Sequence, residues 1–179
     1  TDTTYKSIIT VYDNSGKQLM RNFLSSSRVT DVSISDDNKY LAYSEIDTSG
    51  TLIKSSVKII SIEKAQSNSA ESTIYTKEAE TSKMILKIQY QENSELVCVY
   101  DDSINIVKDG YEQELIKKED EATFVSGNLG NSIAYIKEEQ RSAFNSSSTL
   151  NIVNTSSKQT YKYNFGEIAK EMYTTGNVI

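Results

Sequence analysis

The sequence contains no histidine, no tryptophan and no proline, and it has one cysteine among 179 residues. The absence of histidine excludes Ser-His-Asp and Cys-His catalytic arrangements and every imidazole metal site. Cys98 alone cannot form an internal disulfide, and its apolar neighbours predict a small buried side chain. Glycine is scarce, at seven residues, and neither a GxGxxG nor a GxxxxGK phosphate loop occurs. We therefore expect no cofactor.

Long apolar runs and basic stripes are missing too. No segment approaches the roughly 18 apolar residues of a membrane span, and the polar start, TDTTYKSIITVYDNSG, does not resemble a signal peptide. A first residue other than Met indicates a processed chain or a piece of a longer protein, which could have lost an anchor. The net charge is −6, the pI is about 4.8, and Lys and Arg are scattered. We expect neither a nucleic-acid partner nor direct membrane insertion.

What the sequence does contain is a repeat. A short β-branched segment recurs as IITVYD, VKIISI, INIVKD and LNIVNT, with spacings of 48, 47 and 46 residues between Ile9, Val57, Ile104 and Leu150. A second series, YLAYSE, LVCVYD and IAYIKE, lacks clean alternation, as expected of inner strands that are covered on both faces. Clusters of Asp, Asn, Ser and Gly between these segments predict hairpin turns.

Each unit is thus predicted to hold four short strands in about 45 residues, which is the period of a β-propeller blade. The predicted fold class is all-β. In the last unit, EIAKEMY would also suit a short helix, but its place in the repeat favours a strand. Three complete blades are expected at about 31–78, 83–118 and 122–165, with half-blades at 7–24 and 167–179.

The hairpin VSISDDNKYLAYSE resembles the SPDG-K-LAY hairpin of WD40-like propellers, as in the TolB-type and dipeptidyl-peptidase-type families. Asp36 stands where those families have Pro, and Asn38 where they have Gly. The Gly-His and Trp-Asp pairs of ordinary WD40 repeats are absent, as is the tryptophan signature of PQQ-type propellers. The whole chain looks most like uncharacterised propeller domains of clostridial, membrane-anchored envelope proteins. This resemblance implies a location at the extracellular face of the cell envelope, but it transfers no functional residue.

Residues 1–179 are expected to form one propeller domain or a fragment of a propeller of about 6–8 blades. The alternative is a closed four-bladed ring, because the two half-blades are complementary. A fragment would leave unpaired strand edges at both ends, and open edges recruit partners. A homodimer through those edges is therefore a further expectation.

Paired carboxylates are the one catalytic chemistry left open, as in glycosidases. The candidates are Asp36/Asp37, Asp101/Asp102 and Glu119/Asp120/Glu121. Neighbours along a strand point to opposite faces, so solvated turn charges are the favoured interpretation. A calcium site in DDNK is the alternative for the first group, but the ligand spacing of an EF-hand is missing. We expect these side chains to cap a turn, and no metal site.

In a propeller, the connections between the second and third strands of each blade emerge on one face. The two longest are predicted in IDTSGTLIKSS (46–56) and EEQRSAFNSSS (138–148), and propellers commonly bind ligands on that face. Arg and Phe are typical of interface hot spots, although a loop Phe can also pack over its own blade, and the first loop also suits a solvated turn. The candidate binding residues are Asp47, Thr48, Ser49, Thr51, Arg141, Phe144 and Asn145.

Two functions fit these features. The favoured one is a non-enzymatic interaction module of the cell envelope, which presents one propeller face to a protein or a cell-wall glycan. The alternative is a glycan-active hydrolase or lyase, or an accessory domain of one, that uses paired carboxylates completed by further blades.

Overall fold

The computed structural model describes residues 4–67, 69–81, 83–92, 94–117, 127–142, 145–169 and 172, with the backbone alone for 127–129, 139–142 and 145. The described residues form strands and one short helix, so the all-β prediction is confirmed. In chain order the elements are β1 (Ser7–Tyr12), β2 (Gln18–Leu24), β3 (Ser27–Ile34), β4 (Tyr40–Asp47), β5 (Lys54–Ser61), α1 (Ile62–Gln66), β6 (Thr73–Glu78), β7 (Ile85–Tyr90), β8 (Leu96–Tyr100), β9 (Ser103–Lys108), β10 (Tyr111–Lys117), β11 (Gly127–Leu129), β12 (Ser132–Ser142), β13 (Asn145–Asn154) and β14 (Thr160–Asn164).

These strands make four antiparallel sheets, in which every strand pairs with its neighbours along the chain. The first sheet is β1–β2, the second β3–β6, the third β7–β10 and the fourth β11–β14. The three four-stranded sheets lie where four-stranded units are expected, although the second sheet begins at Ser27 and not near residue 31.

Burial follows the position of a strand within its sheet. β8, with the sequence LVCVY, is buried at every position, whereas β14, with the sequence TYKYN, is exposed at every position. A continuous apolar run thus marks a strand covered on both faces, and alternation with polar residues marks the outer strand. Cys98 lies in β8, and burial raises the pKa of its thiol, which fits the packing role predicted for it.

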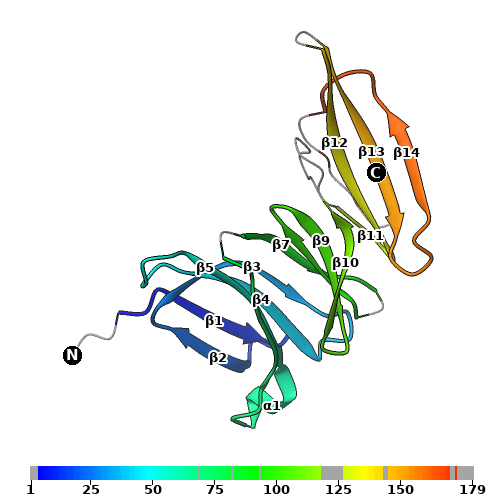
Figure 1. Cartoon of the computed structure of the whole chain (residues 1–179). Coiled ribbons are helices and arrows are strands. Elements are labelled where there is room, and N and C mark those ends of the chain that lie inside the picture. The colour runs from blue at the N-terminus through cyan, green and yellow to red at the C-terminus, as the bar shows by residue number, and fades with distance from the viewer. Residues whose placement is uncertain are drawn as a thin grey trace.

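Successive sheets pack face to face, with an apolar cluster in each interface (Figure 1). Neighbouring residues of β4 serve different interfaces, because side chains alternate across a strand. Tyr43 packs with Met20 of the first sheet, and Ala42 packs with Ile88 of the third. The chain thereby builds a stack of sheets in which the inner strands β4 and β8 each contribute to two cores.

The first strands of the second and third sheets, β3 and β7, run in the same direction. The amide of Ile88 donates to Oδ2 of Asp31 at 2.9 Å, and the amide of Tyr90 donates to Oγ of Ser33 at 2.9 Å. Advancing two residues along β3 thus advances two residues along β7. The turns that follow the two strands consequently lie at the same end of the stack.

A serine hydroxyl near the start of a strand ties one unit to the next in three places. In each place the hydroxyl accepts a hydrogen bond from a backbone amide in the first segment of the following unit. The contacts join Ser7 to Val29, Ser55 to Ile85 and Ser148 to Ala169, at 3.0, 3.1 and 2.8 Å. The repeat found in the sequence is therefore also a repeat of contacts between each of these units and the segment that follows it.

The strand predicted over EIAKEMY is wrong for its described residues, 167–169 and 172, which form no strand. Ala169 and Met172 instead pack against Ala134, Ile136 and Leu150 of the fourth sheet. The amide of Ser148 in β13 donates to the carbonyl of Glu167 at 2.9 Å, but this single backbone contact does not continue into a ladder among the described residues. The remainder of the expected half-blade lies outside the described residues.

Figure 1 shows the four sheets as an open succession from β1 to β14, so their closure into a propeller stays a prediction. Within the part of the chain that is described, no helix combines the length and the apolar character needed to cross a membrane.

Candidate functional site

The first predicted binding loop is a short closed turn. Asp47 pairs with Lys54 across the β4–β5 ladder, so the connection spans 48–53 and not 46–56. Oδ1 of Asp47 accepts hydrogen bonds from the amide and the hydroxyl of Ser49, at 2.8 and 2.6 Å, and the hydroxyl contact lowers the pKa of this carboxyl. Thr48 and Thr51 are exposed beside this turn. The carboxylate is thus used to close the turn.

The second predicted loop is wrong, because the segment forms the outer part of a long hairpin. The ladder between β12 and β13 continues through Glu139–Ser147 and Gln140–Ser146 to Ser142–Asn145. Arg141 lies in β12 and Asn145 begins β13, while Phe144 lies outside the described residues. Polar side chains suggested a loop, but the pairing uses backbone groups that Ser and Asn also possess. Figure 1 places the outer ends of β12 and β13 far from the β4–β5 turn, so Arg141 and Asn145 do not converge with the first set of candidate residues.

The acidic cluster at Asp36–Asn38 is a turn, as predicted. Oδ1 of Asp37 accepts hydrogen bonds from Oγ of Ser35 at 2.7 Å and from the amide of Lys39 at 3.1 Å. The Ser35 contact, followed by the Lys39 contacts, lowers the pKa of Asp37. Asn38 adopts a left-handed conformation with φ of 57°, which Asn tolerates better than most residues. Among the described residues, no group of three or more His, Cys, Asp or Glu side chains could hold a metal ion.

The other candidate carboxylates also have protein partners. Asp101 accepts a hydrogen bond from the amide of Met84 at 3.2 Å, and Asp102 lies 2.9 Å from Nζ of Lys83. The third group, Glu119 to Glu121, lies outside the described residues. The two described groups therefore stabilise connections between strands.

A small cleft of about 160 Å³ between the second and third sheets is lined by three glutamates, Glu80, Glu112 and Glu114. Glu80 pairs with Lys83 at 3.0 Å. Oε1 of Glu112 accepts hydrogen bonds from the Tyr100 hydroxyl at 2.6 Å and from Nδ2 of Asn105 at 3.1 Å. Two of the three carboxylates are thus held by protein groups.

Glu45 is a buried carboxylate at the interface of the first two sheets. It accepts hydrogen bonds from the hydroxyls of Ser27 and Ser56, at 2.7 and 3.1 Å, and it lies 2.6 Å from Nζ of Lys58. Burial opposes the charge on Lys58, but the contacts with Glu45 and Tyr43 outweigh it, so the pKa of Lys58 is raised. This ion pair is satisfied within the fold.

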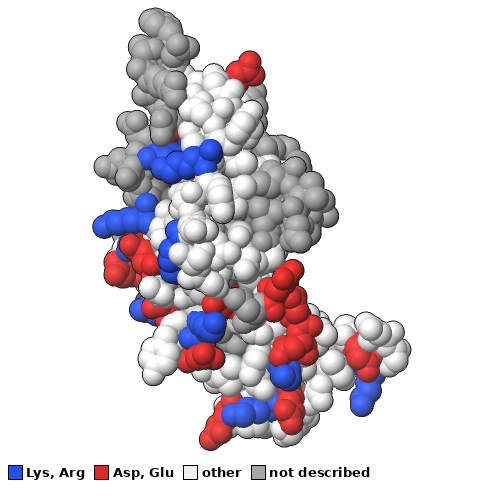
Figure 2. All heavy atoms as spheres, turned by 90° about the vertical axis from the view of Figure 1, so that its right-hand side faces the viewer, with Lys and Arg blue, Asp and Glu red and all other residues white. Residues whose placement is uncertain are grey.

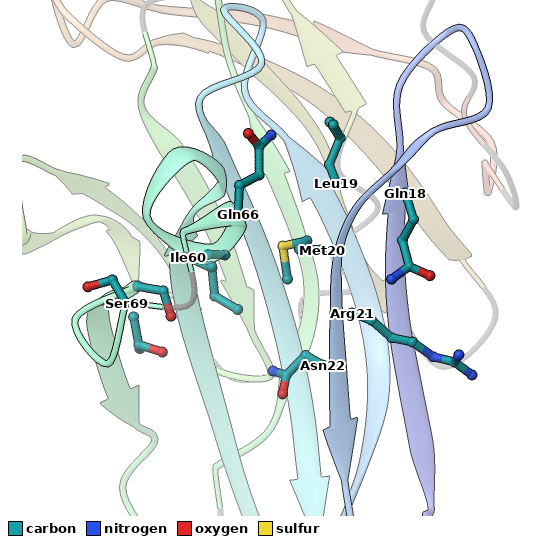
Figure 3. A pocket seen from close by; sticks show the side chains of 11 residues that line it. Gln18, Leu19, Met20, Arg21, Asn22, Ile60, Gln66 and Ser69 are labelled. Atoms are coloured by element: carbon teal, nitrogen blue, oxygen red, sulfur yellow. The ribbon is translucent and has the colours of Figure 1, made fainter.

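A cleft of about 490 Å³ lies between β2 and the segment that runs from α1 to β6 (Figure 3). We call it the helix-side cleft. It is lined by Gln18, Leu19, Met20, Arg21, Asn22, Ile60, Ala65, Gln66, Ser69, Ser72 and Thr73. Its volume falls within the range of roughly 300–1,000 Å³ that is typical of small-molecule sites.

One wall of the helix-side cleft is built by α1 and the turn after it. Oγ of Ser61 accepts a hydrogen bond from the amide of Lys64 and so caps the helix start, while Ile62 is buried and anchors the helix to the core. The amide of Ser61 bonds to the carbonyl of Ser72 at 2.8 Å, which closes the connection. The equivalent connection in the third sheet is the tight turn at Asp109–Gly110. The greater length of 62–72 was the sequence signal that could have revealed this wall.

The interior of the helix-side cleft is polar but uncharged. In Figure 3, Met20 and Asn22 point toward Ile60 and Ser69, whereas Gln18 and Arg21 point away from them. The Arg21 guanidinium instead lies over the ring of Phe23, 4.9 Å from its centroid. Amides and hydroxyls surround an apolar floor, and none of the lining residues is Asp or Glu. This arrangement can bind hydrogen-bonding ligands, but its lining supplies no carboxyl group for acid or base catalysis.

Comparison with known proteins gives a family match. The model of a family described as a family of unknown function (DUF5711) matches residues 1–179. A search of the curated proteins found no match.

Proposed function

The chain belongs to the DUF5711 family, and we propose that it is a non-enzymatic interaction module that binds a glycan of the cell wall through the helix-side cleft. The observation that carries the proposal is the lining of this cleft, where amides and hydroxyls surround Met20 and Ile60 without any carboxylate. Binding sites of this kind combine an apolar surface with a few placed polar groups. A glycan presents both kinds of surface, since its rings carry C–H groups and hydroxyls.

We further propose that the sheets are blades of a β-propeller. Three features support this proposal: the face-to-face stacking of four-stranded meanders, the parallel β3 and β7, and the repeated serine contacts. The location at the extracellular face of the cell envelope rests on the resemblance to clostridial envelope propellers.

The carboxylate-dependent alternative has less support. Its best location is the cleft of about 160 Å³, where Glu112 is held by Tyr100 and Asn105 and Glu80 by Lys83. A general acid or base must be able to reach the proton that it transfers, and these contacts restrict both side chains.

Co-sedimentation with purified Gram-positive cell walls tests the proposed function. Replacing Asn22 and Gln66 together by Ala removes two side chains with hydrogen-bonding amides from the cleft. We expect apparent affinity to fall by at least about tenfold, since each lost hydrogen bond is worth about 1 kcal/mol. Gln113→Ala, an exposed amide on β10, is the matched control and should bind like the wild type. Equal binding by the double variant, or no binding by the wild type, would overturn the proposal.

A further inference from the structure

The interface between the second and third sheets opens into a pocket of about 310 Å³, which we call the tyrosine pocket. Three tyrosines line it: Tyr40 at the start of β4, Tyr75 in β6 and Tyr90 at the end of β7. Tyr90 is buried, and Tyr40 and Tyr75 pack against the same apolar cluster. The aromatic walls are therefore fixed by the core and are present before any ligand binds.

The rim of the tyrosine pocket is polar and rigid. Ser94 lies in the turn before β8, and Asp109 lies in the turn between β9 and β10. Both residues have left-handed backbones, with φ of 60° and 51°. Gly110 follows with φ of 80°, and two successive positive φ values describe the tight hairpin turn that joins neighbouring strands. The Asp109 carboxylate thus stands on a short turn beside an aromatic pocket.

Tyr75 carries a polar atom that the fold leaves without a partner. Its hydroxyl is buried, and no described residue bonds to it. A buried tyrosine hydroxyl usually has a hydrogen-bond partner. Because this oxygen lies beneath the surface, Tyr75 offers a ligand its ring and not its hydroxyl. Burial, with the nearby charge of Glu112, raises the pKa of Tyr75 and keeps this hydroxyl protonated as a donor.

From these observations we infer that the tyrosine pocket is a second ligand site, which binds one pyranose ring of an oligosaccharide. The C–H faces of the ring pack on the tyrosines and on Ile74, and ring hydroxyls bond to Asp109 and Ser94. An aromatic side chain of a partner protein would also pack against these walls. It carries at most one hydroxyl, that of a tyrosine, to bond with the polar groups of the rim. A pyranose ring, which carries several hydroxyls, can contact the tyrosine walls and also form hydrogen bonds with more than one polar group of the rim. This site lies in a different interface from the helix-side cleft and goes beyond the function proposed above.

Calorimetric titration with cellotetraose and chitotetraose tests the inference directly. Tyrosine fluorescence is a second readout, because the chain has 12 tyrosines and no tryptophan. We expect at least one tetrasaccharide to bind and to change the fluorescence. Asp109→Asn keeps a residue that tolerates the left-handed turn, and it should weaken binding by about tenfold or more, since hydrogen bonds to a charged group are the stronger kind. Tyr75→Leu keeps an apolar side chain but removes one aromatic wall, and it should weaken binding by about threefold to tenfold.

Tyr161→Phe, on the exposed strand β14, is the matched control and should bind like the wild type. Thermal unfolding of each variant checks that it is folded. The inference is overturned if neither tetrasaccharide binds, or if Asp109→Asn and Tyr75→Leu both bind unchanged. Tighter binding of N-acetyltyrosinamide with the same sensitivity to these variants would assign the pocket to a protein side chain and also overturn it. Binding that is lost in the Asn22/Gln66 double variant and kept in Asp109→Asn would place the tetrasaccharide in the helix-side cleft and overturn the inference, so the two variants distinguish the two sites.

Discussion

At the scale of single residues, several aspartates of this protein close turns. Asp13, Asp37 and Asp47 each accept a hydrogen bond from the amide two residues further along the chain, at 2.8, 3.1 and 2.8 Å. This contact substitutes for a backbone hydrogen bond and fixes the turn. Each of the three carboxylates also accepts a hydrogen bond from a serine hydroxyl. Ionised side chains thus stabilise three of the connections between strands.

The same contacts predict how stability depends on pH. The serine hydrogen bonds lower the pKa of Asp13, Asp37 and Asp47 below the ordinary value of 3.8. A lowered folded-state pKa gives stability that is present above the unfolded pKa and is lost as the pH falls through the folded one. We therefore expect the urea midpoint to stay level from about pH 7 to pH 5 and to fall below about pH 4.

Replacing the three aspartates together by Asn keeps a side-chain oxygen that can accept, but it removes the titrating groups. The fall in urea midpoint between about pH 5 and pH 3 should be smaller in this variant than in the wild type. The same fall in both proteins would show that other groups cause the acid sensitivity.

The residue scale also shows what the sequence could and could not predict. The turn at Asp36–Asn38 was predictable, because Asp and Asn bond to nearby backbone within the same few residues. The helix-side cleft was not predictable, because Asn22 of β2 and Gln66 of α1 line the same cleft only through the packing of separate segments. A turn depends on residues that are neighbours in the sequence, so it can be predicted from them. A cleft depends on contacts between segments that are distant in the sequence.

At the scale of elements, the contact between Ser55 and Ile85 tests how neighbouring sheets are held together. Ser55 is buried, and its hydroxyl accepts from the amide of Ile85 at the start of β7. Ser55→Ala leaves that amide buried without a partner, which costs about 1–3 kcal/mol. We expect this loss in the free energy of unfolding, measured by urea denaturation. Ser25→Ala, at an exposed position between β2 and β3, is the control and should change it by less than about 0.5 kcal/mol. A loss no larger than that of the control would contradict a joining role for Ser55.

The elements also show why strands were easier to predict than connections. Apolar segments such as LVCVY are buried on both faces, and that burial requires a run which is visible in the sequence. Beyond residue 138 the β12–β13 hairpin continues by backbone pairing through a segment rich in Ser and Asn, which shows no apolar run in the sequence. The helix α1 was missed since its five residues, IEKAQ, are too few to show a helical period.

At the scale of the whole molecule, the charges are mixed over the surface. Figure 2 shows Lys and Arg beside Asp and Glu on the face in view, and several of the described ion pairs join neighbouring segments. Exposed pairs of this kind contribute little stability, with a typical value of about 0–1 kcal/mol. The recognition properties of the molecule are therefore better sought in its clefts and exposed apolar side chains than in its charge.

The first sheet carries the exposed apolar face that leads to the last prediction. Ile8, Tyr12 and Phe23 are 47%, 59% and 46% exposed, and Ile8 pairs with Phe23 across the two strands. Their neighbours Ile9 and Val11 point the other way, into the core. Among the described strands, β1 pairs only with β2, so its other edge is open. An open edge beside an apolar face favours pairing with a second copy, because two identical edges related by a twofold axis complement each other.

We therefore expect light scattering to show a mass that rises with concentration from 20.1 kDa toward twice that value. Ile8→Lys places a charge on the exposed face of β1 and should hold the protein at the monomer mass, because a charge on an edge strand opposes pairing. Tyr111→Lys, at a residue of β10 that is 82% exposed, is the matched control and should dimerise like the wild type. A monomer at every concentration would contradict the prediction. If the Tyr111→Lys control were also monomeric, the interface could not be assigned to β1, since only a substitution on the pairing face should separate the two copies.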